Sequence, residues 1–254
     1  MADTNVLFEG IENKRNQCLI FLVLDTSGSM FGEKIGSVNR AIEEVLDEMQ
    51  SLSDSNPYSQ IEVAVLDFAT TSRWVTNEPL TPENFKKSWI PLTADGMTDL
   101  GSALGELNQK LKRKSHGGWI DDSRGVCAPG IIFFTDGLPT HEYKSQLEKL
   151  KKNGWYQNAF KYCLAAGDDL EDGLEVFKEL VDSKDGHEGI HLITDSNMSK
   201  LADYIKLATI AISKISSSVV SSSSDGSPAQ PVSIVDQRAE VDEELNEIDN
   251  LIGD

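Results

Sequence analysis

Residues 19–30 read LIFLVLDTSGSM, an apolar run that ends in a small polar loop. Apolar runs without polar alternation are typical of β-strands that are covered on both faces. The loop offers the carboxylate of Asp25 and the hydroxyls of Ser27 and Ser29, and Gly28 allows the chain to turn. Hard cations such as Mg²⁺ prefer oxygen ligands of this kind. The stretch therefore predicts a buried strand followed by a candidate metal-binding loop.

Short apolar runs alternate with helical stripes along much of the chain. The strand-like runs are Cys18–Leu24, Ile61–Ala69, Gly130–Thr135, Ala159–Ala165 and Gly189–Thr194. Between them, apolar residues recur at helical spacing in stripes that begin at Ile35, Leu100, Tyr143, Leu170 and Leu201. This alternation predicts an α/β fold, with a doubly wound, mostly parallel six-stranded sheet and helices on both faces. The run Thr71–Thr76 follows too closely for a crossover helix, so we expect one antiparallel edge strand.

The chain has 254 residues and a formal net charge of −19. Such a surface repels phosphates and anionic headgroups, so we expect neither nucleic acid nor a membrane as a partner. The three cysteines form no CxxC pair, which argues against a disulfide scaffold. The first residues lack a basic start followed by an apolar stretch. We therefore expect no signal peptide and a cytoplasmic location.

Composition divides the chain into three parts. Residues 1–215 hold the alternating pattern, and residues 216–235 are a Ser-rich flexible linker. Residues 236–254 form an acidic amphipathic tail, in which a narrow apolar stripe runs among acidic side chains. The tail is either a solvated or self-docked segment or a helix that enters a partner's groove.

Two further loops offer oxygen ligands at the expected position. In open α/β sheets, ligands bind outside the carboxyl ends of the strands. Thr98 lies just before the Leu100 stripe, and Asp136 follows the apolar run 130–135. With Asp25, Ser27 and Ser29 they complete a candidate metal site. Each loop also has an ordinary structural interpretation.

DTSGS could cap a helix, Thr98 or Asp99 could cap the next one, and Thr135-Asp136-Gly137 could be a plain turn. For Asp99 we favour the cap over a ligand.

The segments DTSGS, GMTDLGSAL and FFTDG occur in the order of the metal-ion-dependent adhesion site (MIDAS) of the von Willebrand factor A (VWA) family. The chain resembles this family over residues 18–215, and it looks most like the bacterial intracellular, TerY-like (tellurite resistance) branch. The resemblance implies a VWA, Rossmann-like fold for residues 1–215. It also implies that Ser27, Ser29 and Thr98 contact Mg²⁺, with Mn²⁺ or Ca²⁺ as alternatives, and that Asp25 and Asp136 bind it directly or through water.

One coordination position would stay open for a Glu or Asp of a partner protein. The TerY-like resemblance further implies kinase- or phosphatase-like partners and a role in stress or metal resistance. The expected function is a Mg²⁺-dependent protein-protein interaction module, and not an enzyme.

Two other functions remain open. One is a metal-assisted hydrolase that uses the same loops, although it lacks an evident base or nucleophile if the hydroxyls are ligands. The other is an assembly scaffold that acts through the acidic tail. The H-E-x-x-H pattern at residues 187–191 would need a helix to bind zinc. Because it contains Gly189 and leads into a strand-like run, we expect a loop and a strand there.

Overall fold

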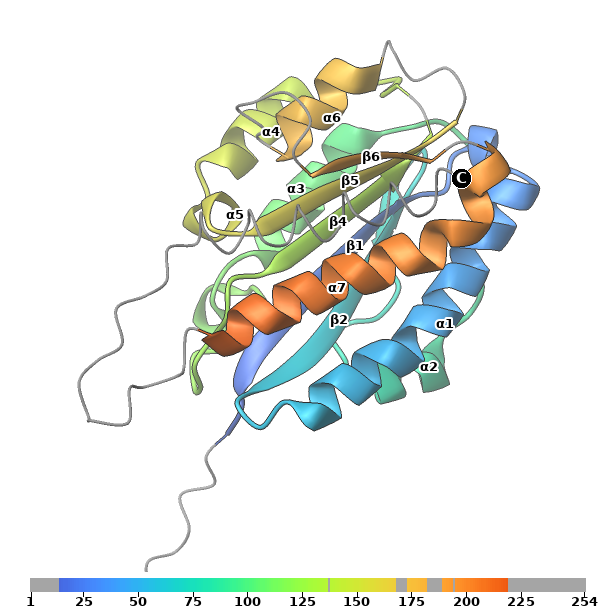
Figure 1. The fold of residues 1–254 in the computed structure, drawn as a ribbon. Helices are drawn as coiled ribbons and strands as arrows, with labels where there is room; N and C mark the ends of the chain where they lie inside the picture. The colour runs from blue at the N-terminus through green and yellow to red at the C-terminus, as the bar shows by residue number, and fades with distance from the viewer. Residues whose placement is uncertain (1–13, 137, 168–172, 182–188, 194, 219–254) are drawn as a thin grey trace, which may run out of the picture.

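The computed structural model describes residues 14–136, 138–167, 173–181, 189–193 and 195–218 (Figure 1). They form one mixed sheet with the strand order β3-β2-β1-β4-β5-β6. The strands are β1 (Asn16–Asp25), β2 (Ser59–Phe68), β3 (Ser72–Trp74), β4 (Gly130–Thr135), β5 (Phe160–Ala166) and β6 (Ile190–Ile193). All neighbouring pairs are parallel except β2 with β3, which is antiparallel. The predicted α/β class and the antiparallel edge strand are confirmed.

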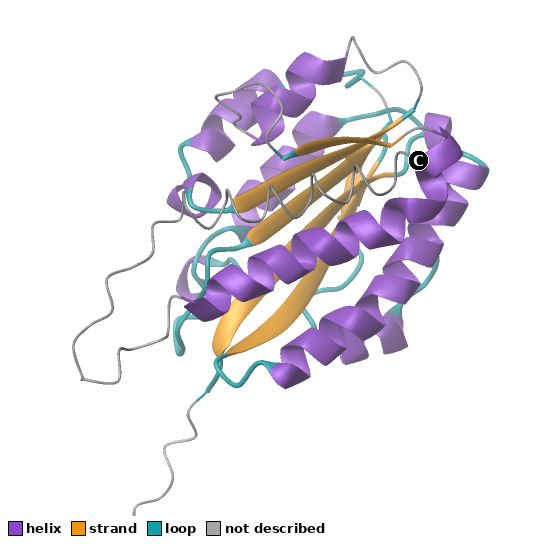
Figure 2. Cartoon of the chain, in the orientation of Figure 1, coloured by secondary structure: helices purple, strands orange, loops and turns teal. Residues whose placement is uncertain are grey.

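Helices cover both faces of this sheet (Figure 2). They are α1 (Glu33–Ser55), α2 (Pro82–Ser88), α3 (Leu100–Lys110), α4 (Lys144–Lys151), α5 (Gly154–Gln157), α6 (Leu174–Val181) and α7 (Leu201–Ser218). The described residues also include the short 3₁₀ helices η1 (Gly28–Met30), η2 (Lys114–His116) and η4 (Asp195–Lys200). In Figure 1, α1, α2 and α7 lie on one side of the sheet, and α3 to α6 lie on the other.

Strand β1 is apolar from Cys18 to Leu24 because this part contributes to two cores. Ile20, Leu22 and Leu24 pack in the core beneath α1 and α7. The alternate residues, from Leu19 to Val23, pack in the second core beneath α3, α4 and α6. A strand between two helical layers has no face left for polar side chains, as its sequence predicted.

The strand order reverses at β1, and this reversal positions the candidate site. Strand β1 pairs with β2 on one side and with β4 on the other, both in parallel. The register pairs Leu24 with Phe134, so Asp25 and Asp136 leave neighbouring strands at the same edge. In open α/β sheets such a point of reversal is where ligands bind.

Several predicted boundaries differ from the structure. The short helices α2 and α5 were not predicted. Helix α6 begins at Leu174, and Leu170, where the predicted stripe starts, lies outside the described residues. Helix α7 continues to Ser218, three residues into the predicted linker. The rest of the linker and the acidic tail, residues 219–254, also lie outside the described residues, so the division into domain, linker and tail stays a prediction.

The H-E-x-x-H segment is only partly described, since residues 187 and 188 fall outside the described ranges. Its last residue, His191, lies in strand β6. The expectation of a strand is therefore confirmed for this end of the pattern. Across the residues that can be described, none of the helices combines the length and apolar character that crossing a membrane requires.

Candidate metal centre

Three loops meet at the carboxyl edge of β1 and β4. We call residues 25–30 the first loop, residues 95–99 the second and residues 135–140 the third. The amide of Gly28 donates to the carbonyl of Gly96 at 2.9 Å, which ties the first loop to the second. The amide of Thr140 donates to the carbonyl of Thr98 at 2.9 Å, which ties the third loop to the second. The backbone therefore fixes all three loops against one another.

A continuous chain of oxygen contacts runs from the first loop to the third. The hydroxyls of Ser27 and Ser29 are 3.0 Å apart. The Ser29 hydroxyl donates to Asp136 Oδ1 at 2.7 Å, across 107 residues of sequence. The fold thus brings three of the five predicted ligands into direct contact.

Asp25 lies beneath this chain as the last residue of β1, and it is fully buried. Its Oδ1 accepts the amide of Ser27 at 2.8 Å, and its Oδ2 accepts the hydroxyl of Thr135 at 2.7 Å. Burial raises the pKa of Asp25 above its ordinary value; hydrogen bonds from Ser27 and Thr135 oppose this rise, and the charge of Asp136 adds to it. Asp25 therefore holds the first loop in shape.

Thr98 is the least directly connected of the predicted ligands. Its side chain is buried within the second loop, and its amide donates to the Thr140 hydroxyl at 3.1 Å. The next residue, Asp99, is the N-cap of α3 and accepts the amide of Ser102 at 2.9 Å. The preference for Asp99 as a helix cap is confirmed.

The helix-cap interpretation of DTSGS is not what the structure shows. Ser27 precedes the short helix η1, but its side chain makes no capping hydrogen bond. It contacts Ser29 instead. The Ser27 and Ser29 hydroxyls thus contact each other, and Ser29 contacts Asp136, instead of capping a helix end.

Lys34 is a residue of this site that the sequence did not reveal to us. Its ammonium lies 2.7 Å from Asp136 Oδ2, and the Asp136 side chain is fully buried. A signal was present, because Lys34 lies in the first turn of α1, where the helix dipole disfavours a cation. A nearby carboxylate offsets this cost, and Asp136 provides one.

The donor set fits a hard divalent cation. Within the described ranges, no three His, Cys, Asp or Glu side chains are grouped closely enough to hold a metal. The converging groups are hydroxyls and carboxylates instead, which are ligands that Mg²⁺ accepts. The ammonium of Lys34 shows that positive charge is stabilised at Asp136. Which of the five residues contact the ion stays a prediction.

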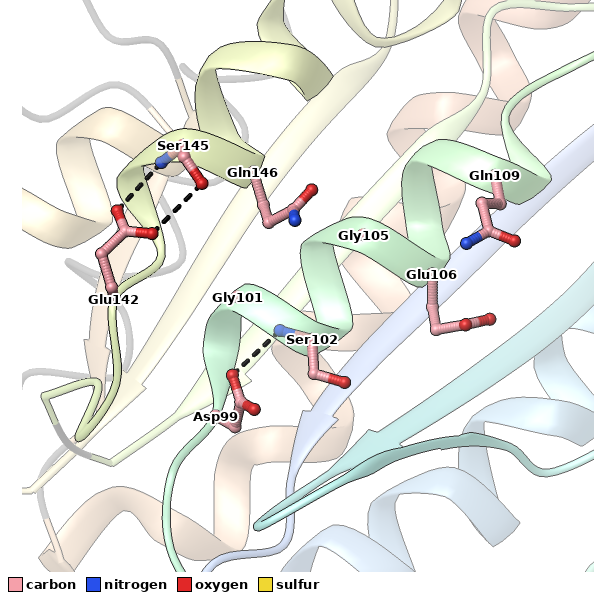
Figure 3. A pocket seen from close by; sticks show the side chains of 9 residues that line it. All are labelled: Asp99, Gly101, Ser102, Gly105, Glu106, Gln109, Glu142, Ser145 and Gln146. Atoms are coloured by element: carbon pink, nitrogen blue, oxygen red, sulfur yellow. Dashed lines mark hydrogen bonds between the residues drawn. The ribbon is translucent and has the colours of Figure 1, made fainter.

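A separate groove of about 290 Å³ lies between α3 and α4 (Figure 3). Figure 3 shows that two of its carboxylates already have partners, since Asp99 bonds to Ser102 and Glu142 bonds to Ser145. A Cβ added at Gly101 would lie 2.6 Å from the carbonyl oxygen of Glu142. The glycine therefore allows the loop before α4 to approach α3 closely, and we assign this region to packing.

Comparison with known proteins identifies the class. The family profile described as von Willebrand factor type A domain matches residues 20–248, so the chain belongs to the VWA family. This is a family of metal-dependent protein-interaction modules that are generally not enzymes. No curated protein sequence gives a significant match.

Solved structures support the fold. A von Willebrand factor type A protein from Catenulispora acidiphila has a TM-score of 0.57 at 17% identity, over 78% of this chain and 43% of that one. The PilB minor pilin from Streptococcus sanguinis has a TM-score of 0.56 at 14% identity, over 84% and 65%. Proximal thread matrix protein 1 from the mussel byssus, with a zinc-occupied MIDAS motif, has a TM-score of 0.51 at 18% identity, over 77% and 48%. The matches span less than two thirds of each of these chains.

Proposed function

We propose that this chain is a Mg²⁺-dependent protein-interaction module that captures a Glu or Asp carboxylate of a partner protein. The observation that carries the proposal is the oxygen chain from Ser27 through Ser29 to Asp136, which joins two loops that are distant in sequence. Membership of the VWA family supports it, and so does the zinc that one structural neighbour holds in its MIDAS motif.

In this proposal Ser27, Ser29 and Thr98 are direct ligands, and Asp25 and Asp136 bind directly or through water. A bound divalent ion would supply a concentrated positive charge to which an external carboxylate can attach. The chain's own residues fix the geometry. Asp25 holds the Ser27 amide, Thr135 holds Asp25, and Thr140 anchors the second loop.

We further propose a cytoplasmic role in a TerY-like stress or metal-resistance system, with kinase- or phosphatase-like proteins among the partners. The motifs DTSGS, GMTDLGSAL and FFTDG support this assignment by their similarity to that branch. Mg²⁺ is the proposed ion because the ligands are hydroxyl and carboxylate oxygens, which hard cations prefer.

The test is capture of partner proteins from native lysate by the immobilised full chain, in Mg²⁺ and in EDTA. We expect captured proteins that are lost in EDTA and with Thr98→Ala. Thr93→Ala is the matched control, because Thr93 is an exposed threonine of the segment that leads to the second loop. Circular dichroism of each variant checks the fold. Capture that persists unchanged in EDTA would contradict the proposed mechanism.

A further inference from the structure

Exposed apolar side chains lie close in sequence to several of the predicted metal ligands. In the part of the chain that the structure describes, large apolar side chains are exposed at Phe31, Tyr58, Ile90, Met97 and Leu138. Three of these flank predicted ligands in sequence. Phe31 is two residues after Ser29, Met97 immediately precedes Thr98, and Leu138 is two residues after Asp136. We call Phe31, Met97 and Leu138 the apolar rim.

Each rim residue is adjacent to, or part of, one of the three loops. Phe31 is 80% exposed, Met97 57% and Leu138 46%. The amide of Phe31 donates to the carbonyl of Gly28, and the amide of Met97 donates to the hydroxyl of Thr70 at 3.0 Å. The backbone amides of Phe31 and Met97 are thus hydrogen-bonded, while the side chains of these two residues are exposed. Exposed apolar groups on a preorganised backbone cost little ordering entropy when a partner covers them.

The loop geometry keeps the rim together. Gly28 of the first loop bonds to Gly96, which has a φ of +86° and could not carry a side chain without meeting Thr70 Oγ1 at 2.4 Å. The Thr98 carbonyl bonds to Thr140 of the third loop. These bonds hold the three loops against one another, and with them the backbone beside each rim residue.

Charge defines what can cover this surface. The centre between the loops already holds the ammonium of Lys34 against Asp136, and its remaining donors are suited to a divalent cation. A partner that fits must therefore bring a carboxylate to the centre and apolar side chains to the rim. A purely polar acidic segment would leave the rim in water, and a purely apolar one would leave the cation without its ligand.

We propose that the apolar rim selects partners in which the metal-binding Glu or Asp is flanked by apolar residues. This rests on the proposed function and adds the chemistry of the segment that it captures. The rim would supply hydrophobic affinity, while the centre supplies the charged contact.

Three synthetic peptides test this with the full chain, by fluorescence anisotropy in Mg²⁺ and in EDTA. They carry the cores Leu-Leu-Glu-Leu-Leu, Ser-Ser-Glu-Ser-Ser and Leu-Leu-Gln-Leu-Leu. We expect Mg²⁺-dependent binding of the first peptide, at least about tenfold tighter than of either other. Phe31→Ser should weaken it about tenfold. Tyr58→Ser is the matched control, because Tyr58 is exposed before β2, at the opposite edge of the sheet.

The outcomes separate the two proposals. Equal Mg²⁺-dependent binding of both Glu peptides would contradict the selective role of the apolar rim, and the proposed function would stand. Binding that is the same in EDTA, or no binding of any peptide, overturns both. Mg²⁺-dependent dimers that Phe31→Ser dissolves would assign the rim to a second copy. Tighter peptide binding in Leu245→Ser would assign it to the acidic tail. Either result would contradict the proposal that the rim binds a different protein.

Discussion

The candidate centre depends on the carboxylate of Asp136, which also forms an ion pair with Lys34. One oxygen of Asp136 accepts the Ser29 hydroxyl, and the other lies 2.7 Å from the ammonium of Lys34. A buried carboxylate needs a countercharge, and in this structure the lysine supplies it. A divalent cation that binds here must either displace the ammonium or bear its repulsion. Lys34 should therefore lower the affinity of the site for metal.

The first prediction is that Lys34→Met binds Mg²⁺ or Mn²⁺ more tightly than the natural chain, by about tenfold, or about 1.4 kcal/mol. The substitution removes the competing charge and leaves the buried Asp136 with the Ser29 hydroxyl but without a countercharge until metal binds. Isothermal titration measures the affinity. The same variant should unfold more readily in EDTA.

Lys87→Met is the control for this prediction. Lys87 also forms an ion pair, with Glu83 at 2.7 Å, but both side chains are exposed on α2. Exposed pairs of this kind contribute little, so metal affinity should not change. An unchanged or weaker affinity in Lys34→Met would show that the ammonium does not compete with the metal.

At the scale of elements, α3 follows the second loop and packs against the chain that follows the third loop. It begins at Leu100, with Asp99 as its cap. Two of its glycines, Gly101 and Gly105, face the region around the start of α4, but their surroundings differ. A Cβ at Gly101 would lie 2.6 Å from a backbone carbonyl, whereas one at Gly105 would be 3.7 Å from the flexible end of Gln146. The same substitution should thus have opposite effects four residues apart.

We expect Gly101→Ala to destabilise the protein by about 1–3 kcal/mol, because backbone must move to admit the methyl group. Gly105→Ala should stabilise it by about 0.5–1 kcal/mol, because alanine is the better helix former and meets only ordinary contacts. Urea unfolding of the two variants measures both changes. A neutral or stabilising effect of Gly101→Ala would mean that α3 and α4 are not held at this spacing.

At the scale of the whole molecule, the reversal of strand order at β1 assembles the site from distant segments. Asp25 is the last residue of β1, and Asp136 follows β4. These strands are neighbours although 104 residues lie between Asp25 and Gly130, the first residue of β4. The apolar run of β1 predicted burial on both faces, and the position of Asp25 and Asp136 after buried strands predicted their shared edge. The α/β class and the shared edge could therefore be read from local pattern.

Two kinds of feature could not be predicted from the sequence: side-chain pairs made by tertiary contacts, and short helices. The pairing of Lys34 with Asp136 and of Thr140 with Thr98 joins residues that no periodicity relates. Helix α2 has a capping Thr81 followed by Pro82, which is a local start signal, but only Pro82 and Phe85 are buried in it. With so few buried positions it shows no helical stripe.

The central claim is that the three loops hold one divalent cation, and titration of the full chain with Mg²⁺ or Mn²⁺ tests it most directly. Ser29→Ala is the decisive variant, because Ser29 is exposed and its hydroxyl links Ser27 to Asp136. Ser51→Ala, at an exposed serine of α1, is its control. We predict one ion per chain, bound by the natural chain and by Ser51→Ala, and at least about tenfold weaker binding by Ser29→Ala. No binding by the natural chain, or equal binding by all three, would contradict the claim.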